Sequence, residues 1–326
     1  MIVDIYTHIF PERFFQELER GSPKLGNMGK RLRSVRKLFD LDMRFRDMDE
    51  IGADYRQIIS LPNPPLEDIA EGAVANNLAK VANDSMAELV AQHPKRFPAF
   101  AAAVNMNDVD FSIREAERAI KMGARGVQTF TNITGHPLDE PRFRPFFNAM
   151  AAHDLPIWIH PARTSAIADY ASEERSRFEM WWCFGWPYET TVAMCRLVFD
   201  GVYDRHPKLK FCLAESAIGW IPFVVQEMDY RYKRQFERRK AAEIPLKNMP
   251  SEIFKRQVWA TYQTDFVGLH LVDFFGDGHI MWGSDYPHPD STWPFSDEIV
   301  AKDSAHLPEN MKRKVYRENA AALYGL

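Results

Sequence analysis

The sequence has little cysteine and no long apolar run. Its three cysteines, Cys183, Cys195 and Cys212, form neither a C-x-x-C pair nor the spacing of a zinc site. This argues against a disulfide scaffold and favours reduced, packed thiols. No apolar stretch approaches the roughly 18 residues that a membrane helix needs, and a strand-like segment starts where a signal peptide would lie. We therefore expect a soluble, cytoplasmic protein with no membrane partner.

An excess of charge of one sign is also lacking. The formal net charge is −4 over 326 residues, which argues against a nucleic-acid partner because such proteins usually carry a basic patch. A glycine-rich phosphate loop after the first strand is missing too, and this disfavours an open, doubly wound nucleotide-binding sheet. These absences leave a small-molecule enzyme or a protein-binding module.

Strand-like and helix-like segments alternate along the chain. Helical periodicity over residues 76–93, 110–123 and 142–154 separates short apolar runs. Such alternation predicts a parallel sheet, and eight units in a chain of this length predict an α/β fold of the (β/α)8 TIM-barrel type. No linker or internal repeat divides the chain, so we predict a single domain over residues 1–326. The expected strands span residues 2–9, 55–62, 97–105, 126–130, 156–161, 210–216, 258–263 and 279–287.

Two insertions interrupt this rhythm, one after the first strand and one after the fifth. Residues 13–50 include the basic stretch GKRLRSVRKL, and residues 163–190 include the aromatic stretch RFEMWWCFGWPYET. Because loops after barrel strands carry function, we expect both insertions to be lids. The aromatic cluster, with Trp181, Trp182 and Trp186, fits ordinary packing or an apolar substrate pocket equally well.

Polar residues gather where the predicted strands end, which is where TIM barrels place their chemistry. Asp4, Tyr6 and His8 alternate along the first strand and therefore share one face of it. The other members follow later strands. Several imidazoles and carboxylates buried at one spot need a cation to compensate their cost. The remaining candidates are His160 after the fifth strand, Glu215 after the sixth, and Asp285 and His288 after the eighth.

With these residues, the chain resembles the amidohydrolase-related group of metal-dependent TIM barrels, which includes aminocarboxymuconate-semialdehyde decarboxylase and the resorcylate-type decarboxylases. The resemblance covers nearly the whole chain and rests on motifs such as DIYTHIFP, PIWIHPA and MWGSDYPHPDSTWP. It implies that His8, His160 and Asp285 bind a divalent metal ion, usually zinc or manganese. It also implies a homodimer.

Two positions depart from the decarboxylase pattern. Tyr6 and Glu215 stand where that pattern has histidines, so two nitrogen donors become oxygen donors. A phenolate binds readily only to a strongly acidic ion such as ferric iron. With Glu215 and His288 added, the donors suffice for a dinuclear iron centre. This resembles TIM-barrel non-heme diiron monooxygenases, whose substrates tend to be coenzyme A thioesters. The first hypothesis is therefore a diiron monooxygenase served by an external electron donor, with an apolar wall supplied by residues 178–186 and basic insertion residues at the nucleotide phosphates.

Three alternatives stay open. In a non-oxidative decarboxylase, one divalent ion would chelate the substrate carboxylate while Arg163 or His288 steadies the charge. In a metal-dependent hydrolase, Asp285 would take a proton from metal-bound water with help from Glu215. In a barrel that has lost its metal and serves as a scaffold, Tyr6 would simply be a packed phenol.

Overall fold

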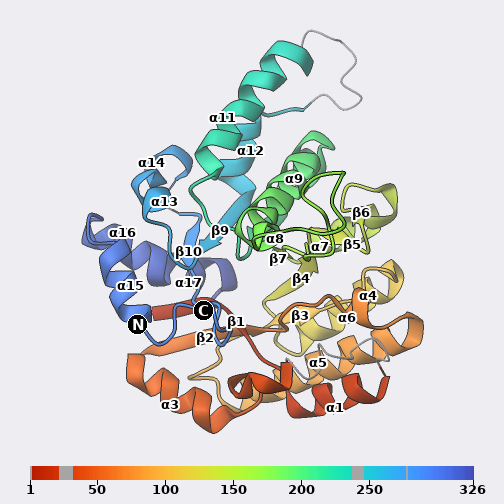
Figure 1. Cartoon of the computed structure of the whole chain (residues 1–326), viewed down its shortest axis with the longest axis vertical. Coiled ribbons are helices and arrows are strands. Elements are labelled where there is room, and N and C mark those ends of the chain that lie inside the picture. Colours follow the sequence, from red (N-terminus) through yellow and green to blue (C-terminus); the bar gives the residue numbers. More distant parts are fainter. Residues whose placement is uncertain (1, 22–31, 237–245, 277) are drawn as a thin grey trace.

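The computed structural model describes residues 2–21, 32–236, 246–276 and 278–326 (Figure 1). Lys30 and Arg31 of the basic stretch in the first insertion lie outside these ranges. The predicted helices are present as α5 (Gly72–Gln92), α6 (Val109–Lys121) and α7 (Arg144–Met150). Helix α6 begins where the sequence supplies a cap, because the Asp108 carboxylate accepts a hydrogen bond from the Phe111 amide at 3.0 Å.

Within the described ranges, eight parallel strands form the barrel wall. Strands β1 and β2 pair with each other, and the other six form a continuous sheet in the order β3, β4, β7, β8, β9, β10. All eight lie within or at the predicted segments. Their bounds are β1 (Ile2–His8), β2 (Tyr55–Ser60), β3 (Ala101–Ala103), β4 (Gly126–Phe130), β7 (Pro156–His160), β8 (Lys210–Leu213), β9 (Val258–Tyr262) and β10 (Ile280–Trp282).

Main-chain hydrogen bonds at two junctions close this wall. The Ile59 amide donates to Ala99 O at 3.3 Å, which joins β2 to the start of the β3 segment. At the other junction, the His8 amide donates to Tyr286 O at 2.7 Å and the Asp285 amide donates to Tyr6 O at 3.2 Å. The first strand therefore meets the last, and the predicted TIM barrel is confirmed.

The remaining elements surround the barrel or extend its loops. Helices α11 and α12 project together at the top of Figure 1, whereas α1, α3 and α5 lie along the bottom. Among the residues described, no helix is long and apolar enough to cross a membrane. The elements are α1 (Glu12–Gly21), α3 (Leu41–Ile51), α4 (Leu66–Ile69), the hairpin β5 (Asn132–Ile133) and β6 (His136–Pro137), α8 (Met180–Cys183), α9 (Gly185–Phe199), α10 (Val202–Arg205), α11 (Ile221–Arg231), α12 (Pro250–Gln257), α13 (Phe266–His270), α14 (Val272–Phe275), α15 (Ser296–Asp303), α16 (Glu309–Arg313) and α17 (Asn319–Tyr324).

The two insertions contain packed helices. In the first, α1 packs on α5 and α3 contacts β2. The second contains an extended loop followed by α8 and α9, which contact each other. These contacts do not test whether either segment opens and closes over a ligand, so the lid role of both insertions remains a prediction, as does the single domain.

A buried carboxylate reinforces the junction of β1 with its neighbours. Asp4 Oδ1 accepts a hydrogen bond from the Ser284 amide at 2.9 Å, and the same carboxylate contacts the hydroxyls of Tyr55 and Ser284. Asp4 is fully buried, and this burial raises its pKa to about 6 even though the hydrogen bonds oppose the change. One side chain thus links β1 to β2 and to the end of β10.

Helix α17 closes the end of the barrel at which the strands begin. Ala320, Leu323 and Tyr324 join the interior cluster that includes Val3 of β1 and Trp158 of β7. The Trp158 indole donates a hydrogen bond to the Tyr324 hydroxyl. Because this floor is filled by side chains, the opposite end, where the strands finish, is the place for a binding site.

We expect Leu323→Ala to lower the free energy of unfolding by about 2–4 kcal/mol, because it leaves a cavity in the barrel floor. Leu323 is only 4% exposed, whereas Leu326 beside it is 44% exposed, so Leu326→Ala is the matched control. Urea unfolding followed by circular dichroism measures both. Equal, small effects of the two substitutions would show that α17 does not hold the floor.

Candidate metal centre

Two imidazoles and two carboxylates converge at the open end of the barrel. His8 Nε2 lies 2.8 Å from Glu215 Oε1 and 3.0 Å from Asp285 Oδ1, and His160 Nε2 lies 3.1 Å from the same Glu215 oxygen. Their side chains are at most 3% exposed. The structure therefore brings together four residues that the sequence placed at the ends of different strands.

The strands aim both imidazoles inward, and neighbouring oxygens orient them. His160 Nδ1 lies 2.6 Å from Pro161 O. A carbonyl can only accept, so the proton belongs on Nδ1 and Nε2 is left with its lone pair. His8 Nδ1 lies 3.3 Å from Ser60 Oγ, whose own proton is donated to Thr7 O at 3.2 Å. This network places a proton on His8 Nδ1 and directs Nε2 at the carboxylates, where an ion could take the place of the second proton.

Both carboxylates stand on unusual backbone. Glu215 has φ +47° and Asp285 has φ +64°, the left-handed region that non-glycine residues seldom occupy. Each such residue costs roughly 1–2 kcal/mol. The turns after β8 and β10 accept this strain, and strain of this kind gathers at functional sites.

The electrostatics of the cluster favour positive charge between the carboxylates. Burial alone would lower the pKa of His8, but the carboxylates of Asp285 and Glu215, 3.0 and 2.8 Å from its Nε2, outweigh burial and raise that pKa to about 9. Burial opposes ionisation of Glu215 as well, yet His160 and His8 hold its pKa well below the ordinary value. Burial and the neighbouring Glu215 raise the pKa of Asp285 well above its usual range.

The cluster fits a divalent cation. His160 Nε2 and Asp285 Oδ1 are buried and have no hydrogen-bond partner within the described structure, although polar atoms lie about 3 Å away. An ion would satisfy both atoms, because imidazole nitrogen and carboxylate oxygen are ligands for zinc or manganese. His8, His160 and Glu215 form one possible ligand group, and His8, Asp285 and His288 form another, with all ligand atoms of each group within 4.8 Å of one another.

Tyr6 lies beside this centre, but its hydroxyl has another partner. The Tyr6 hydroxyl donates a hydrogen bond to Gln128 Oε1 at 2.9 Å, while its ring lies 4.8 Å from the His8 ring. Burial, and then the negative charges of Glu215 and Asp285, raise the pKa of Tyr6 well above 10. This environment favours a neutral phenol in the wall of the centre over the phenolate that the iron hypothesis required.

The aromatic insertion reaches the centre through Trp186. The Trp186 ring lies 5.7 Å from the His160 ring, and Trp181 lies 6.0 Å from Trp186. Trp182 is instead 39% exposed, so the structure separates it from the other two. Phe130 completes the wall at 5.3 Å from the His160 ring.

Arg163 lies beneath this aromatic wall. Its main-chain carbonyl accepts a hydrogen bond from Trp186 Nε1 at 3.0 Å, and its Nη2 donates to Ala168 O at 3.2 Å. Its Nε is buried without a partner in the described structure. A side chain at Gly185 would come within 2.5 Å of Arg163 Cδ, so glycine is needed there for the arginine to lie against α9.

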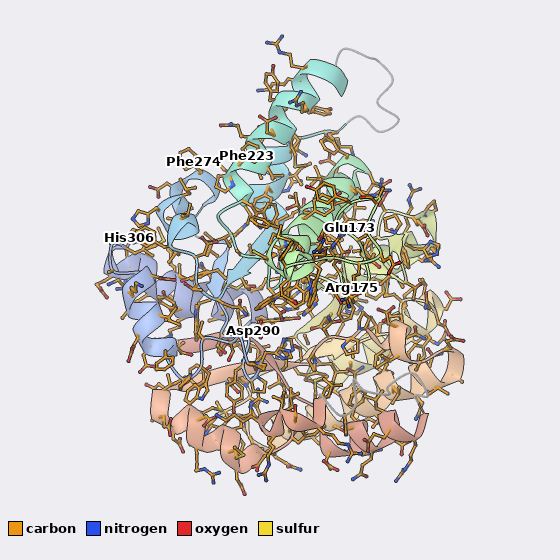
Figure 2. All side chains as sticks on the ribbon, in the orientation of Figure 1. Glu173, Arg175, Phe223, Phe274, Asp290 and His306 are labelled. Atoms are coloured by element: carbon orange, nitrogen blue, oxygen red, sulfur yellow. The ribbon has the colours of Figure 1, made fainter. Side chains whose placement is uncertain are left out.

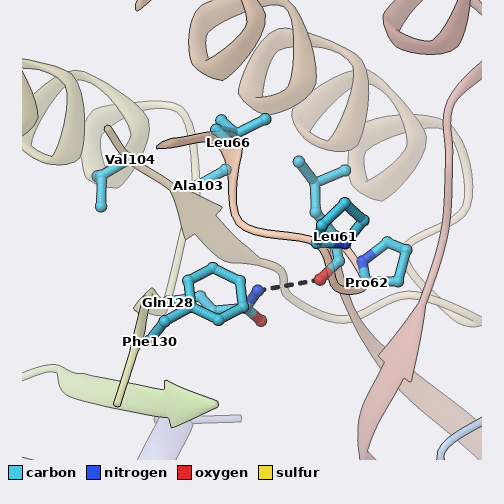
Figure 3. Close-up of a pocket in the computed structure, with 8 residues that line it drawn as sticks. Leu61, Pro62, Leu66, Ala103, Val104, Gln128 and Phe130 are labelled. Atoms are coloured by element: carbon cyan, nitrogen blue, oxygen red, sulfur yellow. Dashed lines mark hydrogen bonds between the residues drawn. The ribbon is translucent and has the colours of Figure 1, made fainter. Parts of the chain in front are cut away.

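Two further polar residues were not identified from the sequence. Gln128 links the Tyr6 hydroxyl to the end of β2 by donating to Leu61 O at 3.0 Å, at the edge of a small pocket with Phe130 (Figure 3). Glu189 accepts from Thr131 Oγ1 at 2.5 Å and from the Ala162 amide at 2.9 Å, which ties the ends of β4 and β7 together. For Gln128, the sequence offered one indication: it is a polar residue inside the apolar strand GVQTF.

The loops that follow β7 and β10 continue from the strand ends at which the cluster lies. In Figure 2, Glu173 and Arg175 of the loop after β7, and Asp290 of the loop after β10, appear over the middle of the molecule. His288 belongs to this last loop and is half-buried, with its ring 4.9 Å from the His8 ring. The side chains of the two imidazoles and two carboxylates are at most 3% exposed, so the protein around the strand ends covers the cluster.

Several known proteins with similar sequences and structures are decarboxylases. A gamma-resorcylate decarboxylase from Polaromonas sp. is 31% identical over 306 residues, which is 89% of this chain and 89% of that protein. The crystal structure of 5-carboxyvanillate decarboxylase from Sphingomonas paucimobilis matches with a TM-score of 0.82 at 25% identity, covering 100% of this chain and 99% of that one. A dihydroxybenzoic acid decarboxylase from Polaromonas sp., with bound manganese and the inhibitor 2-nitroresorcinol, matches with a TM-score of 0.78 at 25% identity, covering 100% and 97%.

These similarities correct the first hypothesis. The diiron monooxygenase is wrong, because the similar proteins are decarboxylases and one of them holds manganese. The oxidoreductase class and the dinuclear iron centre are wrong with it, and the coenzyme A thioester and the electron donor lose their basis. The departures at Tyr6 and Glu215 therefore do not mark an oxygenase. An amidohydrolase family model matches residues 3–326, and the chain belongs to the amidohydrolase family.

Proposed function

We propose that this protein is a metal-dependent, non-oxidative decarboxylase of an aromatic carboxylic acid. The observation that carries the proposal is the buried cluster in which His160 Nε2 and Asp285 Oδ1 lack hydrogen-bond partners within the described structure. The decarboxylases similar to this chain support the reaction class. The ion is manganese or zinc, both of which suit these donors.

His8, His160 and Asp285 are the proposed ligands, and Glu215 and His288 each belong to a possible ligand group that includes His8. When bound, the ion would hold oxygens of the substrate and draw negative charge away from the carbon that loses its carboxylate. Three protein ligands leave coordination positions open for a substrate. Orientation of the imidazoles through Pro161 O and Ser60 Oγ would keep their Nε2 atoms directed at the ion.

The residues of the chain would supply the proton and bind the ring. Decarboxylation breaks the bond from the ring carbon to the carboxylate, leaves the electron pair on that carbon, and needs a proton there as carbon dioxide departs. We assign the transfer of this proton to Asp285, because its buried carboxyl lies within the cluster, 3.0 Å from His8, and burial raises the pKa of this acid in the metal-free protein. Trp186 and Phe130 would hold the apolar ring of the substrate, while Arg163 and His288 would stabilise the negative charge of the substrate.

Two further predictions concern the assembly and the location of the protein. A homodimer and a cytoplasmic location remain predictions. The hydrolase alternative uses the same ligands and has no separate observation in its favour. The scaffold alternative conflicts with the buried, partly unpartnered ligand atoms, which a barrel without a metal would have no reason to keep.

The reaction is tested with the manganese-loaded and zinc-loaded protein and a panel of aromatic acids that includes 2,6-dihydroxybenzoate and 5-carboxyvanillate. We expect one panel member to release carbon dioxide in equal amount to the ring product, at the same rate with and without oxygen. Liquid chromatography and a coupled carbon dioxide assay provide the two measurements. Turnover that requires oxygen, or products of hydrolysis, would contradict the proposal.

We expect His8→Ala and His160→Ala to lower the bound metal from about one ion per chain to less than about a tenth, because each removes a ligand that the others cannot replace. Metal analysis after dialysis measures this directly. His153→Ala is the control, since His153 lies outside the cluster at a helix end and is partly exposed. Full metal content in either ligand variant would refute that residue's assignment.

We expect Trp186→Ala to raise the KM of the substrate found above about tenfold, which corresponds to a loss of roughly 1.4 kcal/mol of binding. The control is Trp182→Ala, because Trp182 is four residues away but points to the surface. We expect its KM to stay within about twofold. A drop in melting temperature without a change in KM would place Trp186 in the core instead of the binding site.

A further inference from the structure

A buried arginine lies directly behind the metal centre. Arg44 of α3 is fully buried, and both of its terminal nitrogens donate to the main-chain carbonyl of His8, at 2.9 and 2.8 Å. Its Nε donates to Gln57 Oε1 at 2.8 Å. The guanidinium therefore uses all three of its nitrogens, and two of them hold the backbone of a proposed metal ligand.

The same guanidinium also contacts the residue that follows Asp285. Its central carbon lies 4.8 Å from the centre of the Tyr286 ring and 5.6 Å from that of Phe97. The Tyr286 hydroxyl donates to Asp47 Oδ2 at 2.7 Å, and Lys37 pairs with the same carboxylate at 2.6 Å. Tyr286 is thus held from both its face and its hydroxyl, and its carbonyl accepts the His8 amide at 2.7 Å.

A structural role in α3 alone does not explain this arrangement. Burying a guanidinium is costly unless it is paired, yet the hydrogen-bond partners of Arg44 are a carbonyl and an amide, which are neutral. Burial lowers its pKa to about 10, so it still carries its charge at neutral pH. An apolar side chain would fill the same space at lower cost, whereas only a planar fork can hold one carbonyl with two nitrogens and stack on a ring.

We infer that Arg44 is a positioning residue for the metal centre: it fixes the backbone of His8 and, through Tyr286, that of Asp285, so that their ligand atoms converge on one ion. This inference rests on the proposed function, because it takes His8 and Asp285 as ligands. It assigns the helix of the first insertion a role in metal binding that a lid would not have.

The test compares Arg44→Met and Arg44→Lys with the wild type. Manganese affinity is measured by titration, and the visible spectrum of the cobalt-substituted protein reports ligand geometry. We expect Arg44→Met to weaken manganese binding about 10- to 100-fold and to change the cobalt spectrum. Arg44→Lys keeps the charge but loses the fork, so we expect it to restore the affinity only in part.

A matched control separates positioning from general loss of stability. Arg118 also donates through all three of its nitrogens, to Glu115 and Asp84, but it is partly exposed and no residue of the centre takes part. We expect Arg118→Met to lower the melting temperature of the metal-free protein but to keep manganese affinity within about twofold of wild type. If Arg44→Met does not fold, Arg44→Lys and Tyr286→Leu are measured in its place, with weakened metal binding expected for both.

The outcomes are distinct. Wild-type manganese affinity and an unchanged cobalt spectrum in the folded Arg44 variants would overturn the inference while leaving the proposed function intact. Equal loss of affinity in Arg118→Met and the Arg44 variants would also overturn it, because the effect would then follow stability. Failure of the wild type itself to bind manganese or cobalt would overturn the ligand assignment and this inference together.

Discussion

The junction between the first and last strands is the constraint on which the rest of the molecule depends. His8 stands at the end of β1 and Asp285 just after β10, so their ligand atoms meet only because the barrel closes between them. The closure uses two main-chain hydrogen bonds and the buried carboxylate of Asp4. Arg44 then holds the same junction from behind, which makes the barrel wall and the metal centre parts of one hydrogen-bond network.

The centre also shows how the fold accepts local cost for function. Glu215 and Asp285 combine burial, mutual repulsion and left-handed backbone, each of which opposes stability. The surrounding barrel supplies the compensation through tightly packed strands and the floor formed by α17. A cation between the carboxylates would offset their repulsion, so metal binding at this site would stabilise the fold.

Much of the architecture could be predicted because it depends on local patterns. Apolar runs gave the eight strands, and the rule that chemistry gathers at strand ends gave His8, His160, Glu215 and Asp285. Side-chain direction could not be predicted. Tyr6 lies on the expected face of β1, but its hydroxyl turns to Gln128, which is 122 residues away in the chain.

The same limit explains the wrong choice of chemistry. A phenol and a carboxylate at the positions of two histidines suggested iron, because residue types alone do not show what surrounds a side chain. In the structure, burial and two neighbouring carboxylates raise the pKa of Tyr6 and favour its neutral form. The role of Arg44 could not be predicted for a similar reason: it binds a main-chain carbonyl, and no residue type in the sequence indicates such a partner.

The floor formed by α17 against β1 bears on how the chain folds during synthesis. At about 5–20 residues per second, roughly 15–65 seconds separate the making of the first strand from that of the helix that covers it. Throughout this interval Val3 and Ile5 cannot pack against Ala320, Leu323 and Tyr324, so the floor of the barrel forms only after α17 has been made.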